Sequence, residues 1–199
     1  MKYISTLFLL NLFFQFSFAQ PNTWTQKADF GGNPRYGGVG FSIGNFGYIG
    51  LGWDGSAFKY DFWEYDPLSN AWTQKANFPG GGRNGATGFA IGNKGYVGLG
   101  LSISAFDDFW EYDPNTNAWT AKTNFPGVAR YAVSGFAIGS KGYVGLGTET
   151  SNGPFYNDFY EYDPSNDTWT PKTAFPGVVR CGATGFAIGT NGFVGMGSN

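Results

Sequence analysis

Short apolar segments separated by glycine and polar turns run along most of the chain, and their alternation is typical of β-strands. In one stretch, residues 87–91 and 96–100 flank the turn 92–95, whose two glycines accept the positive φ of a tight hairpin. Residues 108–113 then alternate, with aromatic side chains richer on one face, and residues 119–122 follow a turn that begins with proline. The pattern predicts four short antiparallel strands in this stretch.

The same four-strand pattern recurs along the chain. A Trp-Thr pair recurs at spacings of 48, 47 and 50 residues, an arginine follows each of these tryptophans by 11 residues, and a block of sequence Asp-aromatic-aromatic-Glu-Tyr-Asp-Pro begins 11 residues before three of them. About 47 residues that carry four strands are typical of one blade of a β-propeller. The tryptophans are Trp24, Trp72, Trp119 and Trp169, and the tyrosines of the block are Tyr65, Tyr112 and Tyr162.

The repeat resembles the kelch family of β-propellers. The resemblance rests on the arginine before the first strand, an aromatic and aliphatic second strand that ends in glycine, and a Tyr-Asp-Pro with six residues between its tyrosine and the next tryptophan. It covers residues 24–199 and implies an all-β, kelch-type β-propeller. Kelch repeats end their second strand with two adjacent glycines. Here the first of these is Leu51, Leu99, Leu146 or Met196, and the second is Gly52, Gly100, Gly147 or Gly197.

Copies of the repeat divide residues 20–199 into three complete four-stranded blades and a partial blade at each end. The N-terminal part supplies only a fourth strand, at Trp24, and the C-terminal part supplies only a first and a second strand. These add up to fifteen strands, one fewer than a four-bladed ring needs, so we expect an incomplete ring that further blades or oligomerisation would complete. The expected segments are 20–34, 35–82, 83–129, 130–179 and 180–199.

The first 19 residues have the features of a secretory signal peptide. Lys2 precedes an apolar run from 7 to 18, and small residues at Ser17 and Ala19 occupy the two positions that signal peptidase reads. Polar residues interrupt the run, which is shorter than the roughly 20 apolar residues of a membrane-spanning helix. We therefore predict cleavage after Ala19, no membrane span thereafter, and an extracellular or periplasmic location.

Composition narrows the chemistry of the mature chain. Residues 20–199 carry 11 basic and 14 acidic side chains, which gives no positive surface for nucleic acid. The chain has no histidine, which excludes nucleophiles with a histidine base and imidazole-bound metals, including the copper site of galactose-oxidase-like enzymes. Cys181 is the only cysteine, so no intramolecular disulfide forms. We expect neither a metal nor another cofactor.

Loop length varies at one place in the repeat, between the second and third strands. Because the strands alternate in direction, this loop and the loop that carries the arginine leave the sheet at the same end. Constant strands beside variable loops are typical of recognition surfaces, so we predict ligand contacts on this face; the same aromatics would also serve to cover the blade ends. The candidate residues are Trp53, Asp54, Phe58, Tyr60, Phe106, Asp107, Glu149, Phe155 and Tyr156.

Two sets of charged residues recur once in each copy. The arginines would either bind an anionic ligand on the loop face or brace loops by donating to backbone carbonyls. We expect the recurring carboxylates to be architectural, because a catalytic pair needs one site with two different environments. The arginines are Arg35, Arg83, Arg130 and Arg180, and the carboxylates are Glu64, Glu111, Glu161, Asp66, Asp113 and Asp163.

The leading interpretation is a secreted, non-catalytic binding module with a protein or glycan partner, which the kelch resemblance also implies. One alternative is a histidine-free carbohydrate enzyme similar to the kelch enzymes that act on sialic acid as epimerases or mutarotases. The other alternative is a structural segment of a longer surface protein.

Overall fold

The structure is a computed structural model that describes residues 23–199. The predicted signal peptide, residues 1–19, lies outside the described residues. Among those that are described, no helix is long and apolar enough to cross a bilayer.

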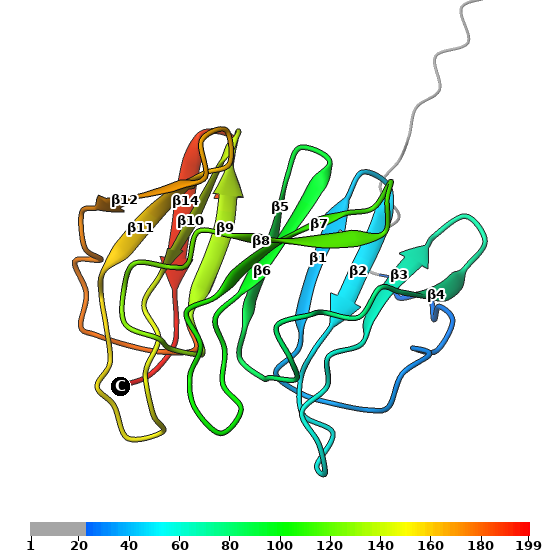
Figure 1. The fold of residues 1–199 in the computed structure, drawn as a ribbon, viewed down its shortest axis with the longest axis horizontal. Coiled ribbons are helices and arrows are strands. Elements are labelled where there is room, and N and C mark those ends of the chain that lie inside the picture. The colour runs from blue at the N-terminus through cyan, green and yellow to red at the C-terminus, as the bar shows by residue number, and fades with distance from the viewer. Residues whose placement is uncertain (1–22) are drawn as a thin grey trace, which may run out of the picture.

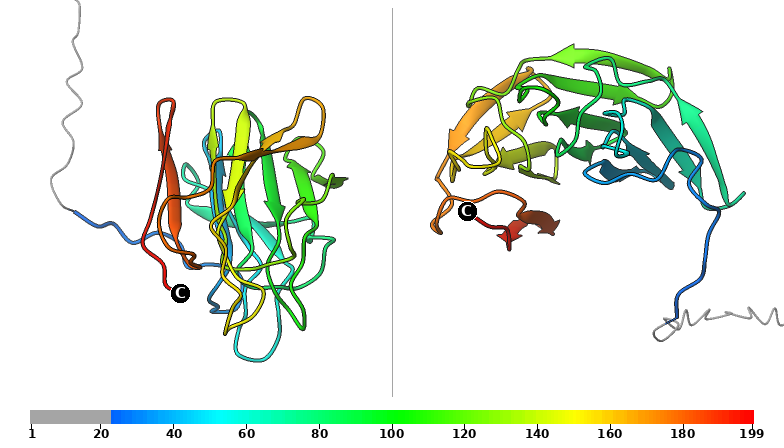
Figure 2. Two further views of the ribbon diagram at one scale, coloured as in Figure 1. Left: turned by 90° about the vertical axis from the view of Figure 1, so that its left-hand side faces the viewer. Right: turned by 90° about the horizontal axis from the view of Figure 1, so that it is seen from below.

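The described residues form β-strands arranged as three four-stranded antiparallel sheets and a C-terminal hairpin, side by side along an open arc (Figures 1 and 2). This is the blade arrangement of a β-propeller-like fold. The first sheet contains β1 (Val39–Ile43), β2 (Phe46–Gly50), β3 (Phe62–Asp66) and β4 (Ala71–Lys75). The second contains β5 (Thr87–Ile91), β6 (Lys94–Gly98), β7 (Phe109–Asp113) and β8 (Ala118–Lys122). The third contains β9 (Ser134–Ile138), β10 (Lys141–Gly145), β11 (Phe159–Asp163) and β12 (Thr168–Lys172), and the hairpin contains β13 (Thr184–Ile188) and β14 (Asn191–Gly195).

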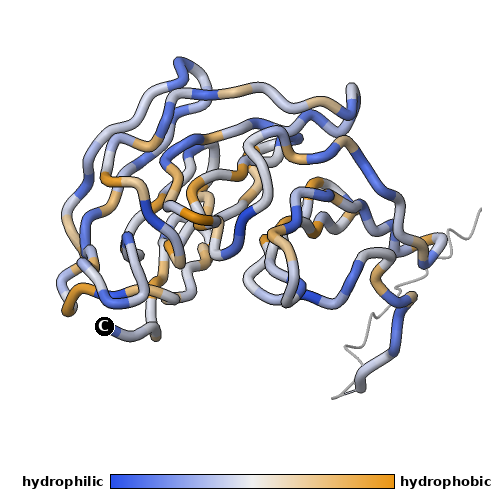
Figure 3. The backbone as a smooth tube through the Cα atoms, turned by 60° about the horizontal axis from the view of Figure 1, so that its bottom comes forward, coloured by the Kyte–Doolittle hydropathy of each residue, from blue (hydrophilic) through white to orange (hydrophobic). Residues whose placement is uncertain are grey.

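The strands predicted for the second copy are confirmed within two residues at each end. The expected strand 87–91 coincides with β5, and the expected strand 96–100 begins and ends two residues after β6. Hydrophobic and hydrophilic positions alternate in short stretches along the backbone (Figure 3). In each sheet the strands lie in chain order. The first strands of successive sheets, β1, β5, β9 and β13, contact one another from sheet to sheet.

Aromatic rings fill the space between neighbouring sheets. Between the first and second sheets, Tyr112 and Trp119 each lie with their ring centroids 5.0 Å from that of Phe62. Between the second and third sheets, Tyr162 and Trp169 lie 4.9 and 5.0 Å from Phe109. Edge-to-face pairs of this kind stabilise by about 0.5–1.5 kcal/mol beyond the burial of their area. The aromatic side chains that alternate along the third strand of each repeat therefore form the packing surfaces between sheets.

Hydrogen bonds explain why tryptophan recurs in the fourth strand. Trp119 donates its Nε1–H to the carbonyl of Ala76, and Trp169 donates to the carbonyl of Thr123, both at 2.9 Å. Each acceptor belongs to the segment that enters from the preceding sheet, so every tryptophan joins two repeats. The same bond from Trp72 to Ala28 is 3.1 Å long. The block tyrosines donate to the turn that follows them, in the pairs Tyr65–Asn70, Tyr112–Asn117 and Tyr162–Asp167.

The strand predicted at Trp24 is absent. Residues 23–30 form no strand, and the Trp24 side chain is fully exposed. A fourth strand needs a third strand as its hydrogen-bonding neighbour, and none of the described residues supplies one for this segment. The strands of residues 23–199 therefore number fourteen, where the sequence predicted fifteen.

Each second strand is followed by a non-glycine residue in the left-handed conformation. The φ angles of Leu51, Leu99, Leu146 and Met196 are 61°, 57°, 60° and 67°. This conformation costs an L-residue roughly 1–2 kcal/mol. The three leucines are fully buried between sheets, so the area that they remove from water offsets the cost, whereas Met196 is 79% exposed. The leucines are therefore core residues in a position whose backbone would suit glycine.

Candidate functional site

The repeat arginines pair with the aspartate that begins each third-strand block. Arg83 Nη2 lies 3.0 Å from Asp108, and Arg130 lies 2.5 and 3.1 Å from the two oxygens of Asp158. Both arginines are fully buried, and each also donates to the carbonyl of the buried leucine that follows the second strand. Of the two alternatives for the arginines, these contacts match the bracing role, with an aspartate partner that the sequence did not indicate.

The four arginines do not come together as one anion-binding cluster. Arg35 pairs with Asp61 in the same two-pronged way, with 2.9 Å between Nη2 and Oδ2. Arg180 lies in the C-terminal hairpin repeat, where the described residues include no third strand to supply an aspartate. Its guanidinium donates to the carbonyls of Val178 and Met196. Each arginine is thus held within its own repeat.

A phenylalanine ring lies about 5 Å from each paired guanidinium, Phe30 at Arg35 included, but a second and closer ring from the variable loop is present only in the second and third repeats. Phe106 lies 3.8 Å from Arg83, measured from the ring centroid to Cζ, and Tyr156 lies 3.8 Å from Arg130. Both residues stand two positions before the paired aspartate. In the first repeat this position is Lys59, whose ammonium turns away to form an ion pair with Asp54. The face of Arg35 that a ring would cover is therefore left without one.

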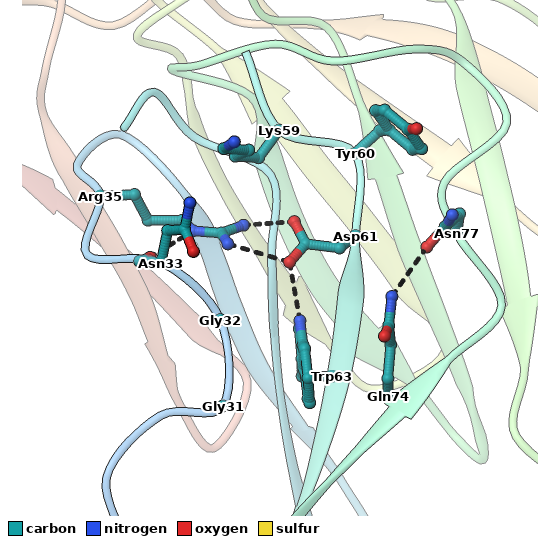
Figure 4. Close-up of a pocket in the computed structure, with 10 residues that line it drawn as sticks. All are labelled: Gly31, Gly32, Asn33, Arg35, Lys59, Tyr60, Asp61, Trp63, Gln74 and Asn77. Atoms are coloured by element: carbon teal, nitrogen blue, oxygen red, sulfur yellow. Dashed lines mark hydrogen bonds and ion pairs between the residues drawn. The ribbon is translucent and has the colours of Figure 1, made fainter. Parts of the chain in front are cut away.

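A cavity of about 340 Å³ opens beside Arg35 on the face formed by the β2–β3 loop and the segment that enters β1. Figure 4 shows the Arg35–Asp61 pair near its centre, with Trp63 below the Asp61 carboxylate. Gln74 and Asn77 lie next to each other on the opposite side of Asp61 from Arg35. Trp63 donates its indole N–H to Asp61 at 2.8 Å, and Gln74 donates to Asn77 at 3.3 Å. We call this the Arg35 cavity. It is lined by Gly31, Gly32, Asn33, Arg35, Lys59, Tyr60, Asp61, Trp63, Gln74 and Asn77.

Charges in and beside the Arg35 cavity are compensated in pairs. Burial raises the pKa of Asp61, but hydrogen bonds from Arg35 and Trp63 and the charge of Arg35 outweigh it and hold that pKa below its usual value. The pKa of Asp54 is also lowered, by its bonds to Lys59 and to the backbone of Ala57 and Ser56. Arg35 and Lys59 thus each face an ionised partner, and the cavity carries no unpaired charge.

The Asp61 pair predicts a specific loss of stability in acid. A carboxyl whose pKa is lower in the folded chain than its unfolded value of 3.8 contributes stability above about pH 4, and the contribution disappears as the pH falls through the folded pKa. Urea unfolding of the natural chain and of Asp61→Asn should therefore differ clearly at pH 6, and the difference should shrink toward pH 2.5. A difference that is the same at both pH values would contradict this assignment.

The remaining candidate residues lie on the same loop face but in separate groups. Trp53 and Phe58 pack on each other within the first loop, with ring centroids 4.4 Å apart, and Tyr60 is 52% exposed at the mouth of the Arg35 cavity. In the third loop, the Tyr156 hydroxyl donates to Glu149, and Phe155 forms a bridge with Thr148. Within residues 23–199, no ring contact connects the first group with the third. The aromatics therefore form no single continuous patch.

A second, more apolar cavity of about 560 Å³ lies between the second and third loops. Glu149 lines it together with Thr150 and Tyr131, and Ile103 at its edge is almost fully exposed. Asp107 lies outside it and accepts a bond from Asn124 at 3.3 Å. Its other lining residues are Leu101, Ser104, Ala105, Val128, Ala129 and Ser151.

The recurring carboxylates all have partners of the same type in every sheet. Glu64, Glu111 and Glu161 each accept a hydrogen bond from a tyrosine of the neighbouring second strand and pair with a lysine of the fourth strand. Asp66, Asp113 and Asp163 accept bonds from the backbone of the following turn. These contacts are repeated structural bonds, as the sequence analysis expected. Among the described residues, no group of three or more acidic or cysteine side chains could hold a metal ion.

Apart from two glycines, sequence reasoning missed six lining residues of the Arg35 cavity. Lys59 is recognisable when the copies are aligned, because it replaces the rings of Phe106 and Tyr156. Gln74 is recognisable in the same way, since Ala121 and Pro171 stand at its position. Asn33 stands out in the same comparison, because Gly81, Val128 and Val178 occupy its position. The other three, Asp61, Trp63 and Asn77, gave no such signal, because only the fold brings them to the same cavity.

Comparison with solved structures finds the same type of fold in YjhT. The similarity has a TM-score of 0.70 at 23% sequence identity and covers 78% of this chain and 55% of the YjhT chain. This chain thus spans about half the length of YjhT, and the likeness concerns the fold. No protein-family model matches the sequence, and no curated protein matches it either.

Proposed function

We propose that the chain is a secreted, non-catalytic binding module of the kelch type, and that the Arg35 cavity binds a neutral saccharide. The observation that carries the proposal is the cavity itself, which is open in the first repeat where the second and third repeats carry a ring. Concave sites with aromatic walls and a few placed polar groups are typical of small-molecule binding.

The lining of the Arg35 cavity favours a sugar over other small molecules. The rings of Trp63 and Tyr60 offer apolar surface for the C–H face of a pyranose. Side-chain amides at Asn33, Gln74 and Asn77 both donate and accept hydrogen bonds, which suits hydroxyl groups. Because the charges of Arg35 and Lys59 are already paired, the cavity offers no free cation for a carboxylate or sulfate.

The contacts of the carboxylates support a binding role more than a catalytic one. Asp61, the acidic residue in the cavity, has counterparts in Asp108 and Asp158 that make the same arginine pair. A residue with this bond in every complete repeat has a structural task already. The enzyme alternative predicts a changed sugar after incubation, which proton NMR of the recovered ligand would detect.

Glycan-array binding by the purified chain tests the proposal, with Lys59→Phe as the decisive variant. This change places at Arg35 the ring that the second repeat has at Arg83, so it should fill the cavity without harming the fold. We expect Lys59→Phe to lose at least about tenfold in affinity for any neutral glycan that the natural chain binds, since it removes both space and contacts.

Two matched variants complete the experiment. Gln74→Ala copies the alanine of the second repeat and should weaken binding through the loss of one hydrogen-bonding amide. Leu68→Ala, which is 93% exposed in the β3–β4 turn at the opposite end of the sheet, should bind as the natural chain does. Unchanged binding by Lys59→Phe, or binding by no neutral glycan at all, would refute the saccharide site.

A further inference from the structure

The joins between neighbouring sheets repeat one contact, in which a phenylalanine ring of one sheet lies over one or two glycines of the next. The ring of Phe41 in the first sheet lies over Gly88 and Gly95 of the second, and a Cβ at Gly95 would lie only 2.6 Å from it. Phe89 lies in the same way over Gly142 of the third sheet, and Phe136 lies over Gly185 and Gly192 of the C-terminal hairpin. Glycine recurs at these strand positions because the ring of the preceding sheet occupies the space of a side chain.

Two backbone hydrogen bonds also recur at every join, one running in each direction. The N–H of Gly85 donates to the carbonyl of Gly37, at 2.8 Å, and the N–H of Gly52 donates to the carbonyl of Arg83, at 2.7 Å. At the later joins the corresponding bonds run from Ala132 to Gly85, from Gly182 to Ala132, from Gly100 to Arg130 and from Gly147 to Arg180.

One end of the arc carries the glycine half of this join without a phenylalanine. A Cβ at Gly40 would have its nearest neighbours 3.8 and 3.9 Å away, and a Cβ at Gly47 would meet only Tyr65, at 3.7 Å. These positions correspond to Gly88 and Gly95. The Gly37 N–H and the Arg35 carbonyl have no backbone partner among residues 23–199.

The other end of the arc carries the phenylalanine half without glycines. Phe186 is 51% exposed, stacks only on Phe193, and occupies the position of Phe41, Phe89 and Phe136. Within the described chain, the Gly182 carbonyl and the Gly197 N–H lack backbone partners. Donors and acceptors are therefore reversed relative to the first end, so each free group at one end matches a free group at the other.

A third match involves Trp24. A cavity of about 810 Å³ beside the hairpin is lined by Phe159, Thr173 and Phe175, among others. These residues correspond to Phe109, Thr123 and Phe125, the three that contact Trp169 one repeat earlier. Trp24 stands in the register of Trp169 and extends, fully exposed, from the glycine end of the arc.

From these matches we propose that a second copy of this chain docks on the C-terminal hairpin, head to tail. Its Gly40 and Gly47 would lie under Phe186, its Gly37 and Arg35 would bond to Gly182 and Gly197, and its Trp24 would enter the cavity at Phe175. The copy is the favoured partner because all three complementary features stand on this chain. Such a join uses two different surfaces, so it closes into a ring if the rotation allows and otherwise extends.

Sedimentation velocity over a range of concentrations tests this surface. The natural chain should associate as concentration rises. Gly47→Glu should sediment as a monomer, with association at least about thirtyfold weaker, because a carboxylate would be buried unpaired under Phe186. The Gly47 φ is not left-handed and its surroundings are open, so this variant should keep the natural circular dichroism and melting temperature. Leu68→Glu adds the same charge on an exposed turn and should associate normally.

A mixing experiment distinguishes head-to-tail docking from any symmetric contact. Phe186→Glu blocks the phenylalanine half of the join. If circular dichroism shows that this variant is unfolded, Ile188→Glu, which is also exposed on β13, takes its place in the experiment. Each blocked variant alone should be monomeric, whereas an equimolar mixture of Gly47→Glu with Phe186→Glu should form a one-to-one dimer through the intact halves. A natural chain that stays monomeric at all concentrations, or a mixture that does so, would overturn the proposal. The two proposals fail separately, because the substituted residues Gly47, Phe186 and Ile188 do not line the Arg35 cavity.

Discussion

Replacing Arg83 with alanine is expected to lower the free energy of unfolding by about 3–5 kcal/mol, because it leaves Asp108 partly buried without its partner. The change also removes the donor to the Leu99 carbonyl and the cation beneath the Phe106 ring. Urea unfolding followed by tryptophan fluorescence measures the loss.

The chain offers its own control for this experiment. Arg180 has the same position in its repeat and a similar distance to a phenylalanine, but no aspartate, and it is partly exposed. Arg180→Ala should therefore cost less than about 1 kcal/mol. If both variants lost the same stability, the arginines would act through their packing and backbone bonds rather than through the aspartates.

Replacing Leu99 with glycine should have the second-largest effect, a loss of about 1–4 kcal/mol. Removal of a buried leucine side chain costs about 2.7–5 kcal/mol, while relief of the left-handed backbone returns roughly 1–2 kcal/mol. The net loss follows because Leu99 is completely buried between Phe89 and its neighbours in the core.

Met196→Gly is the matched comparison. Its φ of 67° is as left-handed as that of Leu99, but its side chain is mostly in solvent. The same substitution should therefore leave stability unchanged or raise it by up to about 1 kcal/mol, as thermal melting would report. Destabilisation of equal size at both positions would mean that backbone conformation, and not burial, decides the cost.

Much of the fold could be predicted from the sequence, because its signals are local. The glycines of the 92–95 turn and the alternation in residues 108–113 specify a hairpin and a half-buried strand without reference to the rest of the chain. The prediction of a strand at Trp24 was wrong because a strand also needs a hydrogen-bonded neighbour, and the pattern of one segment carries no information about that neighbour.

The candidate site was harder to predict from the sequence for the same physical reason. Asp61 and Arg35 are 26 residues apart, and only the return of the chain through β2 brings them together. The sequence placed Tyr60 and Asp54 on the loop face where the Arg35 cavity opens. Lys59 stands out only when the copies are aligned, and the role of the ring over each arginine appears only in three dimensions. The candidate aromatic residues Trp53 and Phe155 illustrate the opposite error, since being in a variable loop does not make two residues neighbours.

The repeated joins between sheets also bear on how the chain unfolds. Outside its own sheet, the first strand of each sheet touches only strands of the adjacent sheets, since β1 contacts β5, β5 contacts β9 and β9 contacts β13. Stability in such a linear array is a sum of sheet and nearest-neighbour terms, so cooperativity is limited to adjoining units. The C-terminal hairpin has two strands and one join, which makes it the unit that opens at the lowest free energy and the place where proteases first gain access.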